Sequence, residues 1–433
     1  MTSSKITLAA TGDSFITRGI PREEEGLKAV REFLLQSDIR FTNLEVTVHN
    51  FDVYPSASSG GTWAAARPRV LEDLQWLGFN TMSFANNHTL DWSHGGLLQT
   101  IEHMDRLGIV HAGAGRNLAE ACQPRYIETP NGRVALIASN STFEHWHAAG
   151  EQRKDLMGRP GLNPLRFKTV HRLRKDDFEG LKTIMDQTDI NAPYLINKLE
   201  GFQGSEEAAA FSVGPYLFEI GEPGTITKMD EQDAMRIEQS IREAARQADF
   251  VVVSHHAHEM KGMAKELPAD FLQEFAYRCI DAGANAYIGH GPHILRGIEI
   301  YRDTPIFYSL GDLFRESEFV EKQPTEFYDI YGLGPEHVPI DGFDQRNRTA
   351  LNALAGNRKV YESVIALLEF EHGKISRLAL QPVTLGFNMP RARRGRPRLA
   401  SEPDRIRILR DLQELSESFG TKIHLDTSLV TIH

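Results

Sequence analysis

Apolar positions in the first third of the chain follow two alternating patterns. Apolar residues three and four positions apart predict helices, and short runs rich in β-branched residues predict buried strands. The expected strands are residues 6–10, 39–48, 80–85, 109–112 and 133–139, and the expected helices are 26–36, 68–77 and 95–107. Strands separated by helices of this length predict βαβ crossovers and a largely parallel sheet.

The pattern stops at about residue 140 and resumes at about residue 229. The stretch 140–228 scatters Gly, Pro, Arg and His among short helical pieces, so we expect an irregular insertion or cap over the site. Beyond it, the expected elements are helices 231–248 and 269–282, strands 250–254 and 286–288, and a hairpin of 298–301 with 305–310. Residues 316–359 read as loops, and a C-terminal hairpin plus helix is expected at about 360–420. We interpret residues 1–433 as a single catalytic domain.

Composition narrows the class of protein. The formal net charge of −11 disfavours nucleic-acid binding, which needs a basic surface. Two cysteines cannot form a disulfide framework. The chain has neither a signal peptide nor an apolar run of about 18 residues, so we expect a cytoplasmic protein that is free of the membrane.

Polar side chains gather where the expected strands end. In open α/β sheets, ligands bind outside the carboxyl ends of the strands, so these side chains should converge. They are Asp13, Glu45, Asn87, His88, Asp91, His256, His290 and His293. Any one histidine is more often a hydrogen-bonded structural residue than a ligand. Five clusters in register at strand ends instead predict a site for a divalent ion such as Mn²⁺, Zn²⁺ or Ca²⁺.

The ordered motifs resemble the CapA family of poly-γ-glutamate capsule proteins, a branch of the calcineurin-like metallophosphoesterases. The residues that carry the resemblance are Gly12-Asp13, Asn43-Leu44-Glu45, Asn86-Asn87-His88 with Asp91, Ser254-His255-His256, Gly289-His290-Gly291-Pro292-His293 and Tyr308-Ser309-Leu310-Gly311. The resemblance implies the α/β calcineurin-like metallophosphoesterase fold, in which helices flank layered β-sheets. It also implies that Asn87 binds metal and that His88 is an acid/base residue oriented by Asp91.

Departures from the binuclear phosphoesterase pattern reduce the expected metal count. Phe15 stands where those enzymes have the histidine of an Asp-x-His motif, and the motif around Glu45 replaces Gly-Asp-x-x-Asp. Asp312 occupies a position where the family usually has Asn, and His258 replaces an expected Gly. Two-metal phosphoryl transfer needs paired ions, so these changes favour one ion over two.

A one-metal site assigns the predicted residues to two roles. The expected metal ligands are Glu45, Asn87, His256 and His290. Asp13 and His293 would then form a second acid/base pair, opposite His88 and Asp91. Two opposed bases are what removal of a Cα proton and reprotonation from the other face require.

Three functions are compatible with this site. The first is Cα epimerisation of the C-terminal residue of a ribosomal precursor peptide, since the chain also resembles the soluble, MslH-type lasso-peptide epimerases. A peptide is then the expected partner: Arg391, Arg393 and Arg394 could receive its carboxylate, and Trp146 its apolar side chain. Arginine runs, however, are usually solvated, and aromatic residues usually belong to a core. The alternatives are metal-dependent hydrolysis of a phosphoester or of a γ-glutamyl or other amide bond, and an accessory role in capsule polymer synthesis.

Overall fold

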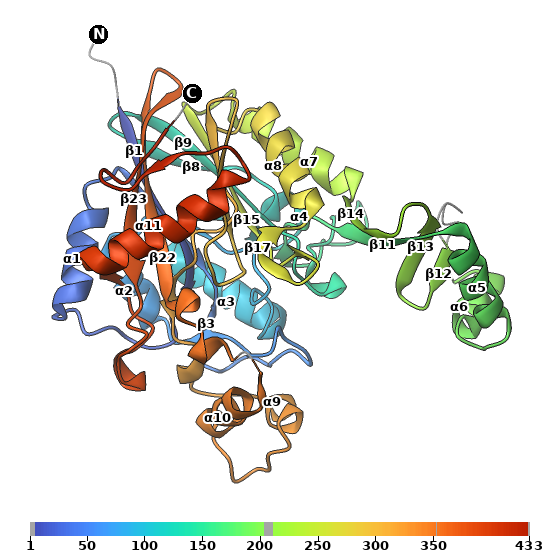
Figure 1. Cartoon of the computed structure of the whole chain (residues 1–433). Coiled ribbons are helices and arrows are strands. Elements are labelled where there is room, and N and C mark those ends of the chain that lie inside the picture. The colour runs from blue at the N-terminus through green and yellow to red at the C-terminus, as the bar shows by residue number, and fades with distance from the viewer. Residues whose placement is uncertain (1–4, 203–210, 352, 432–433) are drawn as a thin grey trace.

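The computed structural model describes residues 5–202, 211–351 and 353–431, and its strands form two large sheets (Figure 1). In the first sheet, the order β25-β26-β23-β22-β1-β2-β5-β6 places β1 (Ile6–Phe15) at the centre. Strand β1 runs parallel to β2 and β21 and antiparallel to β22. The other strands of this sheet are β2 (Ile39–Leu44), β5 (Thr81–Ser83), β6 (Val110–Ala112), β21 (Asp312–Arg315), β22 (Glu362–Glu371), β23 (Lys374–Thr384), β24 (Arg398–Leu399), β25 (Ile423–His424) and β26 (Leu429–Val430).

The second sheet has the order β19-β20-β18-β15-β9-β8. Its central strand β15 (Phe250–His256) runs parallel to both β9 and β18. The remaining strands are β8 (Arg125–Thr129), β9 (Gly132–Asn140), β18 (Ala286–His290), β19 (Ile298–Tyr301) and β20 (Thr304–Phe307). The predicted parallel pairing is confirmed for β1 with β2, β2 with β5 and β5 with β6. The strands are divided between two mixed sheets, however, because strands buried on both faces look alike in sequence whichever sheet they join.

The two sheets face each other across a shared apolar core. Alternate residues of β15 point to opposite sides, so Phe250 and Val252 face the first sheet, while Val251 and Val253 face helices. Leu8 and Phe41 of the first sheet lie in the same cluster as Phe250 and Val252. The molecule is thus a mixed α/β structure with helices outside both sheets.

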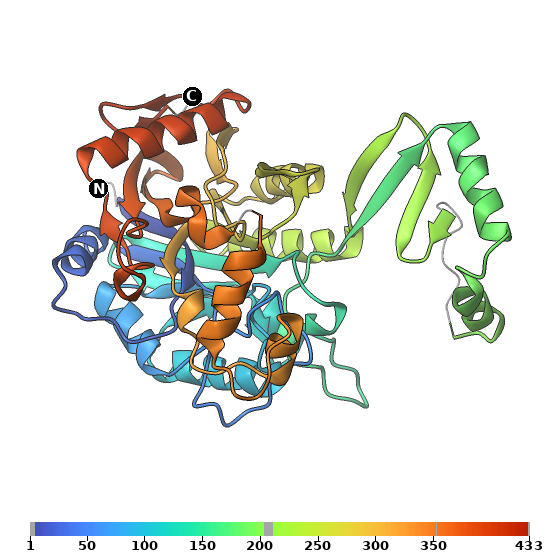
Figure 2. The ribbon, with the colours of Figure 1, turned by 60° about the horizontal axis from the view of Figure 1, so that its bottom comes forward.

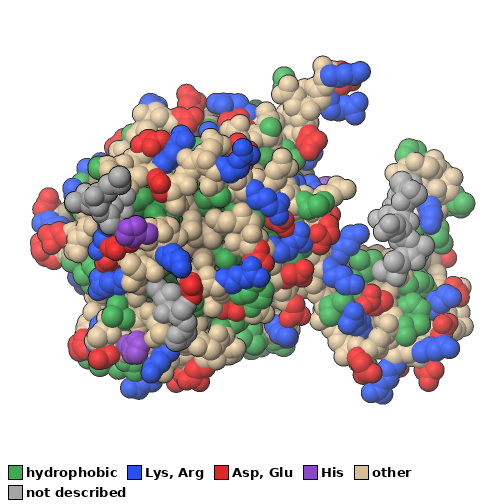
Figure 3. Space-filling view, turned by 90° about the horizontal axis from the view of Figure 1, so that it is seen from above, with side chains coloured by type: hydrophobic (Ala, Val, Ile, Leu, Met, Phe, Trp, Pro, Cys, Tyr) green, Lys and Arg blue, Asp and Glu red, His purple; other side chains and the backbone are tan. Residues whose placement is uncertain are grey.

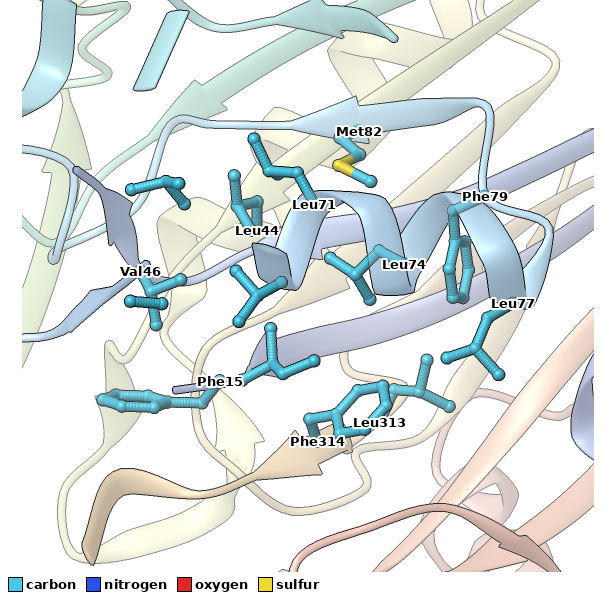
Figure 4. Close-up of a cluster of buried hydrophobic side chains, with 14 of the residues drawn as sticks. Phe15, Leu44, Val46, Leu71, Leu74, Leu77, Phe79, Met82, Leu313 and Phe314 are labelled. Carbon is cyan, nitrogen blue, oxygen red and sulfur yellow. The ribbon is translucent and has the colours of Figure 1, made fainter. Parts of the chain in front are cut away.

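Amphipathic helices cover the outer faces. Apolar residues three and four positions apart in α2 (Arg69–Leu77) pack over β1 and β2, and Leu71, Leu74 and Leu77 lie among the core side chains in Figure 4. Further helices on this side are α1 (Glu25–Leu34) and α3 (Ser93–Arg106). The second sheet is covered by α7 (Glu231–Ala244) and α8 (Asp270–Asp281).

The stretch that reads as irregular contains regular structure. Figures 1 and 2 show an arm, residues 166–202 and 211–229, that extends away from the body, with four strands in the order β12-β13-β11-β14. Its elements are β11 (Phe167–Leu173), α5 (Lys175–Asp186), α6 (Ala192–Leu199), β12 (Phe211–Val213), β13 (Tyr216–Ile220) and β14 (Gly224–Met229). The strands escape sequence prediction because they are only partly buried and show no apolar alternation. A capping role for this segment stays a prediction.

Two helices occupy the region expected to be loops. These are α9 (Thr325–Ile330) and α10 (Pro339–Thr349), both short and polar. Later in the chain, β22 and β23 form an antiparallel hairpin whose turn contains Gly373 at φ 76°, before the last helix α11 (Glu402–Glu417). The remaining elements are β3 (Thr47–Val48), β4 (Ala65–Ala66), β7 (Ala114–Gly115), α4 (Leu118–Ala121), η1 (His145–His147), β10 (Gly161–Leu162), β16 (Met260–Lys261), β17 (Ala264–Pro268), η2 (Ser317–Phe319), η3 (Leu354–Gly356), η4 (Arg358–Tyr361) and η5 (Arg391–Arg393).

Candidate metal centre

The predicted polar clusters meet between the carboxyl ends of strands from both sheets. Asp13 comes from β1, and Glu45 directly follows β2 of the same sheet. His256 and His290 end the parallel strands β15 and β18 of the second sheet, where they are register partners. The sandwich of two sheets therefore brings carboxylates from one layer against imidazoles from the other.

Asp13 contacts side chains from both sheets. Its Oδ1 accepts a hydrogen bond from Nδ2 of Asn43 (2.7 Å) and lies 3.3 Å from Nδ1 of His290 and 3.6 Å from Nδ1 of His256. Its Oδ2 accepts the backbone N–H of Gly291 (2.8 Å). Burial opposes ionisation of Asp13, but the hydrogen bonds and charges of His256 and His290 outweigh it and hold its pKa well below the usual range.

His256 is poised as a neutral ligand. Burial lowers its pKa to about 4, although Asp13 acts in the opposite direction. At neutral pH an ionised Asp13 thus faces an unprotonated His256. Deprotonated carboxylates and neutral imidazoles are the states that bind metal ions.

Three overlapping groups of side chains have the spacing of metal ligands. Within each group, one potential ligand atom per residue lies within 4.8 Å of the others. The groups are Asp13 with His256 and His290; Glu45 with His256 and His258; and Asp13 with Glu45, His293 and Asp312. Because the groups share Asp13, Glu45 and His256, they form one continuous centre.

Unpartnered buried oxygens show that this centre fits a cation. Both carboxylate oxygens of Glu45, and Oδ1 of Asn87, are buried without a hydrogen-bond partner among the described residues. Burial, followed by the charges of Asp13 and Asp312, raises the pKa of Glu45 well above its usual value. Buried polar oxygens rarely lack a partner, and a divalent ion would satisfy those of Glu45. Carboxylate, amide and imidazole donors suit a hard or borderline ion.

His293 lies against a carboxylate that sequence reasoning did not assign to the site. Its Nδ1 is 3.0 Å from Oδ1 of Asp312 and 3.9 Å from Oε2 of Glu45. Asp312 is also held by Arg315, whose Nη1 donates to Oδ2 (2.8 Å). The predicted partner, Asp13, belongs to the same group of ligands, so its acid/base pairing with His293 stays a prediction. Asp312 directly follows the Tyr308–Gly311 motif and replaces the usual Asn. This position next to a motif could have identified Asp312 as a residue of the site.

His88 and Asp91 form a close pair at the edge of the centre. Nδ1 of His88 lies 2.6 Å from Oδ2 of Asp91, and that oxygen also accepts the backbone N–H of Ala64. Burial raises the pKa of Asp91, and the nearby His88 acts against this rise. The ring of Phe15 meets the ring of His88 edge-on at 5.2 Å between centroids. Phe15 therefore restricts His88 by packing and supplies no ligand atom.

Two further histidines surround His256. Nε2 of His258 is 3.2 Å from Nε2 of His256, and the His258 ring meets that of His293 edge-on at 5.3 Å. The sequence identifies His258 only as a departure from a motif and does not predict it as a ligand. His255 is a structural residue, since its ring nitrogens lie 2.8 Å from Oγ of Ser139 and 3.2 Å from Oγ of Ser141.

The predicted substrate-binding residues do not belong to the groups of potential metal ligands, and some of them are engaged in ion pairs. Arg391 pairs with Glu318 (3.3 Å) and Asp344 (2.5 Å), and Arg394 pairs with Glu318 (3.1 Å). Arg393 is exposed at the surface. Trp146 packs against the apolar core on the α1–α3 side. Their binding of a substrate stays a prediction.

The surface is mixed in charge. On the face shown in Figure 3, Lys and Arg side chains are interspersed with Asp and Glu. Across the described ranges, none of the helices combines the length and the apolar character that crossing a membrane requires.

Comparison with known proteins identifies relatives over most of the chain. The model of the family described as bacterial capsule synthesis protein, PGA_cap, matches residues 7–317. The protein y4uA of Sinorhizobium fredii is 35% identical over 433 residues, which cover 97% of this chain and 91% of that protein. The probable polyglutamine synthesis accessory protein MT0602 of Mycobacterium tuberculosis is 26% identical over 294 residues, covering 65% of this chain and 57% of the relative. The PGA biosynthesis protein CapA of Bacillus subtilis is 45% identical over 107 residues, covering 23% of this chain and 27% of the relative.

Proposed function

The chain belongs to the bacterial capsule synthesis protein family, and from this premise we propose that it is a metal-dependent hydrolase of amide bonds in a glutamate-rich peptide or polymer. The names of two relatives, a PGA biosynthesis protein and a probable polyglutamine synthesis accessory protein, support this class of substrate. We extend that class to γ-glutamyl bonds and to a role in making or trimming such a polymer.

One observation carries the proposal. Glu45 is fully buried, and neither of its carboxylate oxygens has a hydrogen-bond partner in the part of the chain that the structure describes, although Asp13, Asp312 and three histidines surround it. A fold that encloses so many charged and polar groups gains little stability from them, because burying unpaired charge is costly. Their concentration is therefore best explained by function.

The residues divide into those that hold an ion and those that move protons. Asp13, Glu45, Asn87, His256 and His290 would hold it, and when bound it supplies Lewis-acid activation of a carbonyl group and of water. His88 is the proton donor to the leaving amine: its Nδ1 contacts Asp91, which leaves Nε2 for proton transfer. Asp91 fixes the ring and stabilises the protonated form.

A second candidate is Cα epimerisation of a peptide, and a different observation favours it. The site contains two histidine–carboxylate couples, His88 with Asp91 at 2.6 Å and His293 with Asp312 at 3.0 Å. Two couples on one cavity could remove a proton from one face of a Cα atom and return one to the other. Hydrolysis needs only one of them as an acid.

A single incubation in D₂O distinguishes the candidates. Protein loaded with Mn²⁺ or Zn²⁺ is incubated with a γ-linked glutamate trimer and, separately, with a linear peptide, and the products are measured by mass spectrometry. Fragments mean hydrolysis, and a gain of one deuterium without cleavage means epimerisation. No reaction of either kind at metal saturation would refute both enzymatic proposals and leave an accessory role.

Two substitutions and the measured metal content test the same two candidate reactions. His88→Ala should abolish the observed reaction, whereas His145→Ala, at an exposed histidine outside the centre, should not change it. Two equivalents of bound metal per chain would favour hydrolysis, and one equivalent would favour epimerisation.

A further inference from the structure

A separate cavity lies beside the metal centre, between η2, α10 and η3. Its volume is about 150 Å³. Its walls combine apolar side chains, among them Phe319, Tyr361 and Leu354, with the guanidinium groups of Arg315, Arg346 and Arg394. Such a mixture suits a ligand that has a short apolar stem and an anionic group.

The cavity wall carries more positive than negative charge. The single carboxylate in the wall, Glu318, already contacts Arg391, Arg394 and Nδ2 of Asn347. Arg346 has no carboxylate within salt-bridge distance among the described residues. Its Nη1 donates to the carbonyl oxygen of Gly61 and to Oγ1 of Thr62, both at 3.2 Å. A guanidinium group has five N–H donors, so most of those of Arg346 stay available to a ligand.

Arg315 contacts one proton-transfer couple directly, and Arg346 contacts a loop that lies against the other couple. Arg315 binds Asp312, which in turn lies 3.0 Å from His293. Arg346 holds the loop at Gly61, whose neighbour Gly60 fits closely against the other couple. A Cβ atom at Gly60 would lie 2.7 Å from Nδ2 of Asn87 and 3.7 Å from Cε1 of His88. The cavity is therefore connected to the centre at two points.

We propose that this cavity is an anion subsite that binds a carboxylate of the substrate, next to the bond that reacts. Arg346 is its principal donor, and Arg315 and Arg394 supply additional positive charge. The identity of the ligand, a γ-linked glutamyl chain with a free α-carboxylate on each residue, rests on the proposed function. Of the arginines expected to contact a carboxylate, Arg394 lies in the wall of this cavity, whereas Arg391 lies outside the wall and is engaged with Glu318 and Asp344.

The test measures binding and does not depend on turnover. The metal-loaded full chain is titrated by calorimetry with a γ-linked glutamate trimer and with the same trimer whose carboxylates are converted to carboxamides. Wild-type protein should bind the acid at least about tenfold more tightly than the amide, since hydrogen bonds to charged groups are the stronger ones. Arg346→Gln should remove most of that difference.

Arg348→Gln is the matched control. Arg348 lies two residues further along α10, is exposed, and donates to Gln345 outside the cavity wall, so its loss should leave the affinity unchanged. Ala353→Leu, which narrows the cavity without altering charge, covers the case in which Arg346→Gln disturbs the Gly61 loop. It should weaken binding of the acid by about tenfold or more, the loss expected when a ligand group no longer fits its pocket.

The outcomes separate this inference from the proposed function. Equal affinity for acid and amide, or equal effects of Arg346→Gln and Arg348→Gln, would overturn the subsite. Tight, Arg346-dependent binding without cleavage in the D₂O incubation would support the subsite and refute hydrolysis. Cleavage that is insensitive to both Arg346→Gln and Ala353→Leu would support hydrolysis and refute the subsite.

Discussion

Replacing Glu45 with glutamine should separate its role in metal binding from its effect on the fold. Burial and the charges of Asp13 and Asp312 raise the pKa of Glu45 well above its usual value of 4.5. For a carboxyl group with a raised folded-state pKa, the contribution to stability is present below the unfolded-state pKa and is lost as pH rises through the folded-state pKa. Between those two pKa values only the unfolded state loses its proton, which lowers the stability of the metal-free protein.

The two effects of the substitution have opposite signs. In metal-free protein, Glu45→Gln should raise the free energy of unfolding by about 1.4 kcal/mol for each pH unit between the unfolded-state and folded-state pKa of Glu45, because the neutral amide does not titrate. At a metal concentration about 1,000 times the dissociation constant, wild-type protein should gain about 4.1 kcal/mol from binding. The variant, lacking a carboxylate ligand, should gain much less. The order of stability of the two proteins should thus invert when metal is added.

The assay is thermal unfolding of chelator-treated protein with and without added Mn²⁺ or Zn²⁺, together with metal analysis after dialysis. Glu316→Gln is the matched control, because Glu316 is equally buried but pairs with Arg18 and Arg396. Breaking that pair should destabilise the protein by about 3 kcal/mol with or without metal. Lower stability of metal-free Glu45→Gln than of wild type, or equal stabilisation of the two proteins by metal, would contradict the assignment of Glu45 as a metal ligand.

Three further predictions follow from individual contacts. His88→Ala should lower kcat by about 10²–10⁴-fold without changing metal content, and a retained kcat would exclude His88 as the acid. His49 is 0% exposed and burial lowers its pKa to about 4, so between pH 6.5 and 4 only the unfolded state binds its proton. Stability should therefore fall by about 1.4 kcal/mol per pH unit on acidification through this window, and His49→Gln should remove that part of the slope in chemical unfolding; an unchanged slope would contradict the assignment. Gly12→Ala should prevent folding into soluble protein, since a Cβ there would lie 1.8 Å from the carbonyl oxygen of Gly311, whereas Gly180→Ala, with open space around it, should fold normally; equal yields would contradict this packing.

Much of the secondary structure could be predicted because its signal is local. The run of β-branched residues at 250–254 identified β15, and Gly373 marked the turn of the β22–β23 hairpin. Other elements gave no such signal. Helices α9 and α10 are short, and the strands of the arm are only partly buried, so neither group shows a sustained apolar period.

For the site, too, some features could be predicted from the sequence and others depend on the tertiary structure. The sequence by itself determined that Asp13, Glu45, Asn87, His88, His256, His290 and His293 lie at or near strand ends, since a strand boundary depends on its own residues. It also showed that Phe15 offers no ligand. Only the tertiary structure decided which of these side chains meet, because Asp13 and Glu45 come from one sheet and His256 and His290 from another. The contact of His293 with Asp312 and the cavity under Arg346 were decided at the same level. They arise from the packing of segments far apart in sequence, which no periodicity records.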